Sequence, residues 1–242
     1  MRTLYSAIGI SPCLLLMGAA PPPPASLRIT PLSVDVTAPE AASSITLQNT
    51  GDAEISLQVR LFKWTQADGD DKLEPATDVV VSPPAIKVAP GRSYTVRVAR
   101  TAKTAVTGED SYRLWVDELP PAAPPRPGGG TVGVRMRYNL PVFFHPDGVA
   151  PKLAWRGYRS GDQLIVEATN SGTGNARVDG LKVTTAQGQI AFGEGLNGYV
   201  LAGATRRWST PVGANPGANG EATVIAGVGG RETRSPVTLA AR

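Results

Sequence analysis

The sequence predicts an all-β protein made of two immunoglobulin-like β-sandwich domains joined at an angle. Apolar and polar residues alternate with a period of two along most of the chain, and almost no segment has helical spacing. Glycine and proline contribute 27 and 22 of the 242 residues, and they stand between the alternating segments as turn residues without any fixed repeat. Short strands separated by such turns are typical of immunoglobulin-like sandwiches.

The chain begins with a segment that resembles an export signal. A positive Arg2 precedes a mostly apolar run over residues 7–20, and Pro21 then ends the run. The run is shorter than the roughly 20 apolar residues that cross a membrane. We therefore expect residues 1–25 to be a signal peptide that directs export, with the cleavage point left open. Removing it would also remove Cys13, the only cysteine, so we expect no disulfide.

The strands follow in two blocks. In the first block we expect strands at 27–36, 43–49, 55–64, 79–82, 93–99, 111–118 and 131–144. In the second block we expect them near 152–158, 163–170, 177–185, 199–201, 205–209, 222–226 and 237–240. Turn residues around Pro146 separate the blocks. The predicted domains are therefore 26–145 and 146–242.

The composition excludes several kinds of chemistry. One cysteine and one histidine cannot form a disulfide scaffold, a cysteine-ligated zinc site or a multi-histidine metal site. His145 has no serine or cysteine motif around it and lies beside the expected domain joint, so we interpret it as a hinge residue. Asp68, Asp70 and Asp71 lack the length and the closing glutamate of a calcium loop, and an acidic hairpin tip is the better interpretation. We expect no metal, no cofactor and no enzymatic activity.

The charge pattern argues against a nucleic acid partner. The formal net charge is only +4, and lysine and arginine form no run. No later segment is long and apolar enough to insert into a membrane. We therefore expect no nucleic acid partner and no membrane insertion.

The expected strand at 131–144 is unusually long for a strand. Val132, Val134 and Met136 lie on one face, while Arg135 and Arg137 point to the other. A long edge strand with an apolar face invites pairing with another chain, and proteins retain such edges when pairing is their function. The alternative is that the three apolar side chains simply fill the core of their own sandwich.

Three separated segments resemble the PapD-like family of periplasmic chaperones of the chaperone-usher pathway. They are VVSPPAIKVAPG at 80–91, YTVRV at 94–98 and SYRLWVDELPP at 111–121. Residues 132–146 resemble the last strand of that family's first domain, and RYNLPVF at 137–143 is similar to its archaic branch. The resemblance is strong over 27–146, whereas only the strand pattern supports it in the second domain.

The resemblance implies a function for the long strand. Family members bind a pilus subunit that lacks its final strand, complete its fold with their own edge strand, and deliver it to an outer-membrane usher. The donor residues would be Val132, Val134 and Met136. The same edge could also pair two free copies of the protein.

The resemblance also implies an anchor for the carboxylate at the end of the subunit. The family's usual arginine and lysine positions fall on Ser33 and Pro141, so the usual anchor is absent. Because a guanidinium can bind a carboxylate through two parallel hydrogen bonds, we consider Arg113 and Arg137 as replacements. The alternative for each is a solvated arginine on a strand.

Two further positions match residues that pair near the hinge in relatives, namely Arg97 and Asp110, and we assign them a structural role with His145.

A second class of function stays open, because an exported structural or adhesive pilus subunit would share the fold. Such a subunit would begin with an alternating apolar extension and often carry a disulfide, whereas this chain has a proline-rich start.

Overall fold

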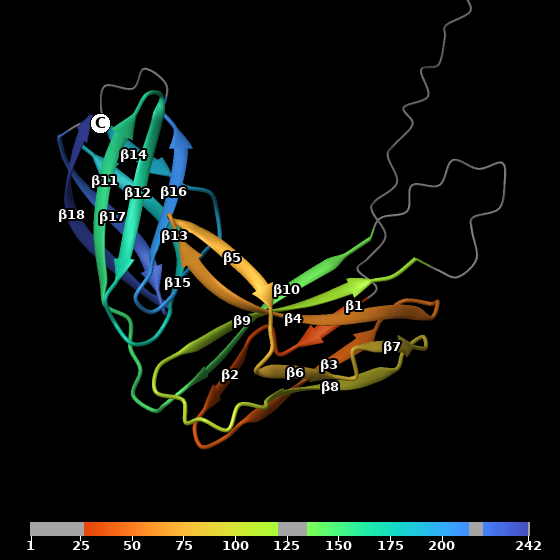
Figure 1. Cartoon of the computed structure of the whole chain (residues 1–242). Coiled ribbons are helices and arrows are strands. Elements are labelled where there is room, and N and C mark those ends of the chain that lie inside the picture. Colours follow the sequence, from red (N-terminus) through yellow and green to blue (C-terminus); the bar gives the residue numbers. More distant parts are fainter. Residues whose placement is uncertain (1–26, 121–134, 213–219, 242) are drawn as a thin grey trace, which may run out of the picture.

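The computed structural model describes residues 27–120, 135–212 and 220–241. All regular secondary structure in these residues is β-strand (Figure 1). The first ten strands are β1 (Leu27–Thr30), β2 (Val34–Thr37), β3 (Ala42–Asn49), β4 (Ile55–Ala67), β5 (Asp70–Pro75), β6 (Val79–Ser82), β7 (Ala85–Val88), β8 (Ser93–Arg100), β9 (Asp110–Glu118) and β10 (Arg137–His145). The others are β11 (Leu153–Ser160), β12 (Gln163–Asn170), β13 (Ala176–Thr185), β14 (Gly188–Ala191), β15 (Leu196–Val200), β16 (Thr205–Pro211), β17 (Gly220–Val228) and β18 (Arg231–Ala241). The all-β prediction is confirmed, and the expected signal segment lies outside the described residues.

Strands β1 to β10 form a sandwich of two sheets. One sheet has the order β1-β3-β8-β6, and the other has the order β2-β10-β9-β4-β5 with β7 beside β4. The inward side chains form one core of the expected alternating residues, including Ile45, Leu47, Leu57, Val59, Val96, Val98, Leu114, Val116, Val142 and Phe144. The period-two pattern therefore predicted which face of each strand is buried.

The prediction of one continuous strand at 27–36 is wrong. β1 pairs antiparallel with β3, whereas β2 lies in the other sheet and pairs parallel with β10. Pro31 lies between them and has no N–H to continue a ladder. The buried residues also change parity, from Leu27 and Ile29 in β1 to Val34 and Val36 in β2. The chain crosses from one sheet to the other at this point.

Strands β11 to β18 form the second domain. They follow the order β14-β13-β17-β18-β11-β12-β16, with β15 beside β13. β18 pairs antiparallel with β17 and parallel with β11, so it links the two halves of the folded sheet. A separate core lies between these halves, built from residues such as Leu164, Val166, Val178, Leu181, Val183, Val200 and Val224.

Each domain contains a buried asparagine whose side chain donates hydrogen bonds to main-chain carbonyls. The Asn49 side chain donates to the carbonyls of Ala53 (2.7 Å) and Val88 (2.8 Å). The Asn170 side chain donates to the carbonyls of Gly174 (2.8 Å) and Val200 (3.1 Å). A buried loop carbonyl needs a donor, so each asparagine stabilises the loop that follows it.

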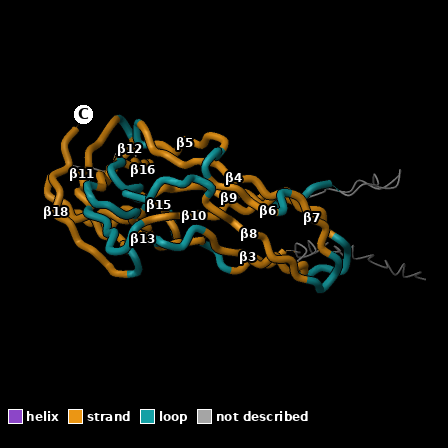
Figure 2. The backbone as a smooth tube through the Cα atoms, turned by 60° about the horizontal axis from the view of Figure 1, so that its bottom comes forward, coloured by secondary structure: helices purple, strands orange, loops and turns teal. Residues whose placement is uncertain are grey.

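The two domains meet at an angle, and a small apolar cluster fills the joint between them (Figures 1 and 2). Trp64 and Phe143 come from the first domain, and Tyr199 and Leu201 come from the second. The rings of Trp64 and Tyr199 meet edge to face with centroids 5.7 Å apart, which is a favourable geometry. This cluster is separate from both sandwich cores, so it belongs to the domain interface.

The β4–β5 hairpin also crosses the joint. β4 continues past the predicted end at 64, and its last residues pair with β5, so the acidic hairpin tip is confirmed. The Gln66 side chain donates to the Tyr199 carbonyl (2.8 Å) and accepts from the Leu201 N–H (2.9 Å). At the tip, the Gly69 carbonyl accepts from the N–H of Arg207 (3.1 Å). The hairpin thus binds main-chain groups of the second domain.

Within the described ranges, no helix is long and apolar enough to cross a membrane. The same residues contain no group of three or more His, Cys, Asp or Glu side chains that could hold a metal ion.

Candidate functional site

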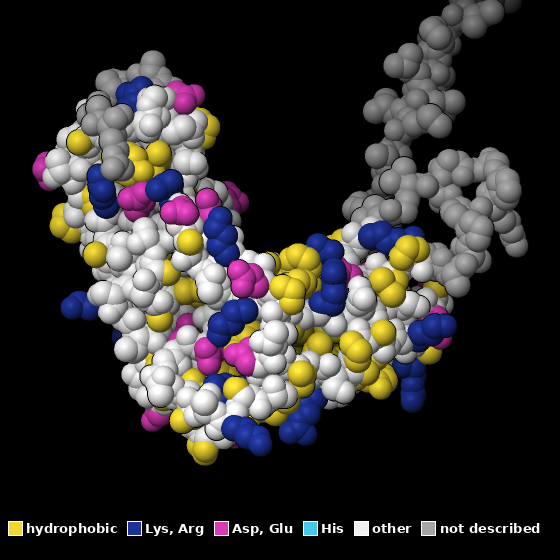
Figure 3. Space-filling model, viewed as in Figure 1, with side chains coloured by type: hydrophobic (Ala, Val, Ile, Leu, Met, Phe, Trp, Pro, Cys, Tyr) yellow, Lys and Arg dark blue, Asp and Glu magenta, His cyan; other side chains and the backbone are white. Residues whose placement is uncertain are grey.

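The main candidate site is a cavity of about 600 Å³ between the two domains. The first domain contributes the β1–β2 loop, β9 and the first half of β10, and the second contributes β13 and β15. The lining residues are Leu32, Ser33, Arg113, Arg137, Tyr138, Asn139, Leu140, Pro141, Arg177, Leu196 and Tyr199. Figure 3 shows the hollow between the domains, with basic, acidic and apolar side chains around it.

Arg113 lies where the two domains meet in this cavity. Its guanidinium carbon is 3.6 Å from the ring centroid of Trp64 and 5.4 Å from that of Tyr199. Burial lowers the pKa of Arg113 from its ordinary value, and the nearby Asp71 carboxylate opposes this shift. Among the described residues, no carboxylate forms an ion pair with Arg113. Its charge is held by aromatic faces and remains available to an anion.

Arg137, the second predicted anchor, has a carboxylate partner. Its Nε atom binds Asp117, which also binds Arg60 at 2.7 Å. Burial raises the pKa of Asp117, but the two guanidinium groups outweigh it and hold the pKa below its ordinary value. Arg137 also lies over the Trp115 ring, with 4.1 Å between the guanidinium carbon and the centroid. The charge of Arg137 is therefore largely compensated, unlike that of Arg113.

Ser33 and Pro141 line the same cavity. These are the positions where the resemblance leads one to expect an arginine and a lysine. Pro141 lies opposite Arg113 in the ladder between β10 and β9. The cationic group in this part of the cavity is thus supplied by the neighbouring strand.

The predicted donor strand is only partly described. Val132 and Val134 lie outside the described residues, and regular pairing begins at Arg137. Met136 is 42% exposed, and its carbonyl accepts from the N–H of Glu118 (3.1 Å), so the ladder with β9 extends this far. Met136 therefore does not fill the core of its own sandwich.

The expectation that 131–144 is an edge strand throughout is wrong. Val142 to His145 pair with β2 on one side, and Val142 to Phe144 also pair with β9 on the other. Residues 137–141 pair with β9 alone among the described strands. Within β10, the open edge is thus its first half, which forms one wall of the cavity.

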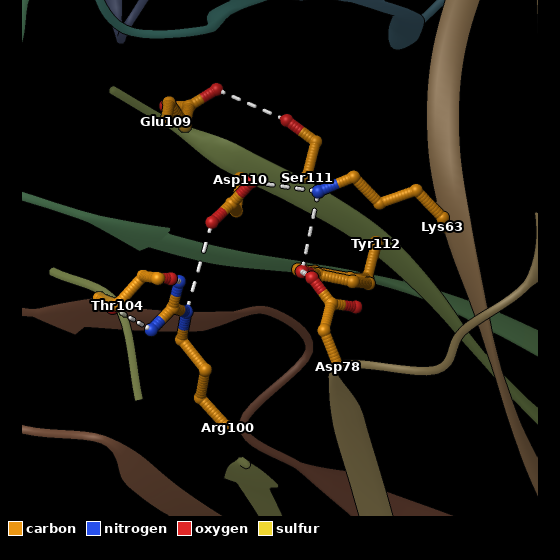
Figure 4. A network of polar contacts seen from close by, with 8 residues as sticks. All are labelled: Lys63, Asp78, Arg100, Thr104, Glu109, Asp110, Ser111 and Tyr112. Carbon is orange, nitrogen blue, oxygen red and sulfur yellow. Dashed lines mark hydrogen bonds and ion pairs between the residues drawn. The ribbon is translucent and has the colours of Figure 1, made fainter. Parts of the chain in front are cut away.

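The expected pair of Arg97 and Asp110 does not form. Arg97 is exposed on β8, whereas Asp110 binds Lys63 (2.7 Å) and lies 3.7 Å from Arg100 (Figure 4). Side chains alternate along β8, so Arg100 lies on the opposite face from Arg97. Asp110 therefore contacts Lys63 and Arg100 instead of Arg97.

The same network reaches the second domain through Glu109. This carboxylate accepts from the Asn175 backbone N–H (2.9 Å) and from its side-chain amide (2.8 Å). It also accepts from the Ser111 hydroxyl at 3.3 Å (Figure 4). Glu109, one of the first-domain residues drawn in Figure 4, therefore connects the first domain to Asn175 of the second domain.

His145 ends β10 and lies at the joint. Its Nδ1 atom is 2.8 Å from the Pro146 carbonyl oxygen, and its Nε2 atom contacts the Asp35 carboxylate. Burial lowers the pKa of His145, but both of these acceptors and the Glu109 charge outweigh it, so the pKa lies above its ordinary value. Both ring nitrogens face acceptors, which favours the charged imidazolium.

The sequence did not point to the residues from the second domain. Arg177, Leu196 and Tyr199 complete the cavity, yet they lie in a part of the chain where only the strand pattern carried information. For these residues, the one signal in the sequence was a leucine, Leu196, in a glycine-rich segment. Docking of the domains brings these residues to Arg113.

Comparisons with known proteins agree with this architecture. A family model described as the pili and flagellar-assembly chaperone PapD N-terminal domain matches residues 26–150. The chain is 30% identical over 144 residues to the chaperone protein FimB/FhaD of Bordetella pertussis, an alignment that covers 56% of this chain and 57% of that protein. The chain thus aligns with little more than half the length of this curated relative.

Two solved complexes contain a chain with a similar fold. One is the pre-assembly complex of the chaperone CsuC with the tip adhesion subunit CsuE, from the archaic chaperone-usher Csu pili of Acinetobacter baumannii. The similarity covers 89% of this chain and 99% of that chain, with 25% identity and a TM-score of 0.68. The other is the Salmonella enterica SafA pilin in complex with the SafB chaperone, with 88% and 94% coverage, 19% identity and a TM-score of 0.58.

Proposed function

The chain belongs to the PapD-like family of pili and flagellar-assembly chaperones, and we propose that it captures pilus subunits by lending them an edge strand. This family consists of non-enzymatic periplasmic chaperones of the chaperone-usher pathway. In the proposed cycle, the protein completes the fold of a subunit that lacks one strand and then delivers it to an outer-membrane usher. Residues 1–25 would export the protein, 26–145 would form the chaperone domain, and 146–242 would form the second domain.

The observation that carries this proposal is the open first half of β10, which leads along the cavity wall toward Arg113, a residue without an ion-pair partner among the described residues. A bound strand would pair with residues 137–141 and continue toward Met136, Val134 and Val132. The solved complexes of chaperones of similar fold with CsuE and SafA support a pilus subunit as the partner. Main-chain hydrogen bonds would align the two paired strands. The alternating apolar side chains would fill pockets of the subunit.

We assign the subunit's terminal carboxylate to Arg113 in preference to Arg137. Arg113 has no carboxylate partner among the described residues, whereas Arg137 already binds Asp117. An incoming carboxylate would have to displace or share that partner. Arg137 would then contribute a weaker, longer-range attraction.

The anchor is tested by co-expressing the protein with a tagged pilus subunit encoded beside it and measuring the complex that is recovered. A hydrogen bond to a charged group contributes about 1.5–3 kcal/mol, so Arg113→Ala should weaken the complex by about 10- to 100-fold. Arg137→Ala should have a smaller effect. Arg97→Ala is the matched control, because this exposed arginine lies on the other sheet. Undiminished recovery with Arg113→Ala would refute the assignment.

The donor strand is tested in the same assay. Val134→Asp should abolish the complex while the chaperone stays folded, because the client's pocket would have to bury a charge. Val80→Asp is the control, since Val80 is an exposed valine on β6. Retained binding with Val134→Asp would refute strand donation. If co-expression instead produced a series of polymers of increasing size, the protein would be a structural subunit and not a chaperone.

A further inference from the structure

Two leucines at the interdomain cavity have exposed side chains. Leu32 in the β1–β2 loop is 72% exposed, and Leu196 at the start of β15 is 52% exposed. Neither belongs to a hydrophobic core cluster. They come from different domains, yet both line the cavity that contains Arg113. The cavity therefore offers apolar surface from both sides of the joint.

The charges that line this cavity have one sign. Among the described residues that line it, Arg113, Arg137 and Arg177 are the charged ones, and none is an aspartate or glutamate. Arg137 binds Asp117, and Arg177 lies 3.5 Å from Asp179. Arg113 has no such partner among the described residues. The cavity consequently attracts an anion. The attraction is strongest at Arg113.

A chain terminus matches this combination better than an internal acidic residue. The terminal residue carries its carboxylate and its side chain on the same Cα atom. One residue can therefore contact both a guanidinium and an apolar wall. An internal aspartate or glutamate uses its whole side chain to present the carboxylate and leaves nothing to bury against leucine.

We propose that this cavity selects clients whose last residue has a large apolar side chain, with the carboxylate on Arg113 and the side chain against Leu32 and Leu196. The inference rests on the proposed function, because it specifies the partner of the same site. Tyr199 forms the base of the cavity from the second domain, and Gln66 holds its main chain through a 2.8 Å hydrogen bond. Selection therefore depends on the docked arrangement of both domains.

The test uses the full-length mature protein and three acetylated tetrapeptides with the sequence Gly-Ser-Gly followed by a variable last residue. The last residue is leucine with a free carboxylate, serine with a free carboxylate, or leucine amide. Binding is followed by nuclear magnetic resonance shifts. The leucine acid should bind about tenfold more tightly than the serine acid, because part of one leucine side chain becomes buried. Leucine amide should lose a similar factor, because it carries no negative charge.

Variants separate the two contributions. Leu196→Ser should remove the preference for leucine over serine and keep the preference for acid over amide. Arg113→Ala should do the opposite. Leu119→Ser is the matched control, since Leu119 is an exposed leucine that does not line this cavity.

Equal affinities for the leucine and serine acids would overturn the inference, as would a leucine preference that survives Leu196→Ser. Absence of binding by all three peptides would also overturn it. The subunit pull-down distinguishes this failure from failure of the proposed function. A normal wild-type complex without peptide selectivity would refute only the inference, whereas loss of the complex itself would refute the chaperone role.

Discussion

Gln66 provides the sharpest test of how the two domains are held together. Its side chain forms two hydrogen bonds with main-chain groups of the second domain, one to the Tyr199 carbonyl at 2.8 Å and one from the Leu201 N–H at 2.9 Å. Tyr199 and Leu201 are both buried in the joint. Gln66→Ala removes both bonds without changing any residue of the apolar cluster.

The expected loss follows from the two bonds. A hydrogen bond within a protein contributes about 0.5–1.5 kcal/mol net, so Gln66→Ala should lower the free energy of unfolding by about 1–3 kcal/mol. Each kcal/mol corresponds to a decrease in Tm of about 2–4 °C in a protein of this size. Urea unfolding followed by circular dichroism measures the free energy, and small-angle X-ray scattering measures the change in the interdomain angle.

Gln58→Ala is the matched control, because Gln58 is an exposed glutamine on the same strand. We expect this variant to change the free energy of unfolding by less than about 0.5 kcal/mol, as is usual for surface positions. If Gln66→Ala matched Gln58→Ala in stability and in scattering, the hairpin would not contribute to the joint. The reasoning about Gln66 would then be refuted.

Two further predictions concern the same joint. Gly69→Ala should weaken domain docking, because Gly69 has a φ of +86° and a Cβ there would lie 2.8 Å from the Cβ of Arg207; scattering identical to that of the wild type would contradict this. His145 has a pKa above its ordinary value of about 6.5, so its contribution to stability should be complete below pH ~6.5 and should be lost as the pH rises through the folded-state pKa. Because it is the only histidine, its single proton resonance reports the titration, and Asp35→Asn should lower the midpoint while the Glu109 charge keeps part of the shift.

Much of the fold could be predicted from local patterns. The strand at 163–170 has the bounds of β12, and the expected strands at 43–49, 93–99 and 111–118 differ from β3, β8 and β9 by one residue at one end. These strands have one buried face, so their apolar residues alternate visibly.

Strands without such a face were missed. β5 (Asp70–Pro75) contains mostly exposed polar residues, and Leu73 is its only strongly apolar side chain. It forms a strand because β4 supplies a pairing partner, not because its own sequence alternates. β14 (Gly188–Ala191) is similarly exposed, and it pairs with β13.

The candidate site could likewise be predicted only in part from the sequence. The resemblance singled out Arg113 and Arg137 as possible anchors. Only the three-dimensional structure separates the two arginines, because Asp117 compensates the charge of Arg137 and aromatic rings surround Arg113.

The sequence by itself determined the strand class, the buried faces and the family, because these depend on local periodicity and on short motifs within one domain. The tertiary structure alone decided where the open edge of β10 ends, which arginine keeps a free charge, and which leucines border it. Those properties depend on contacts between residues that are distant in the chain, such as Gln66 and Leu201, which are 135 positions apart. Local patterning carries no information about such contacts until the two domains dock.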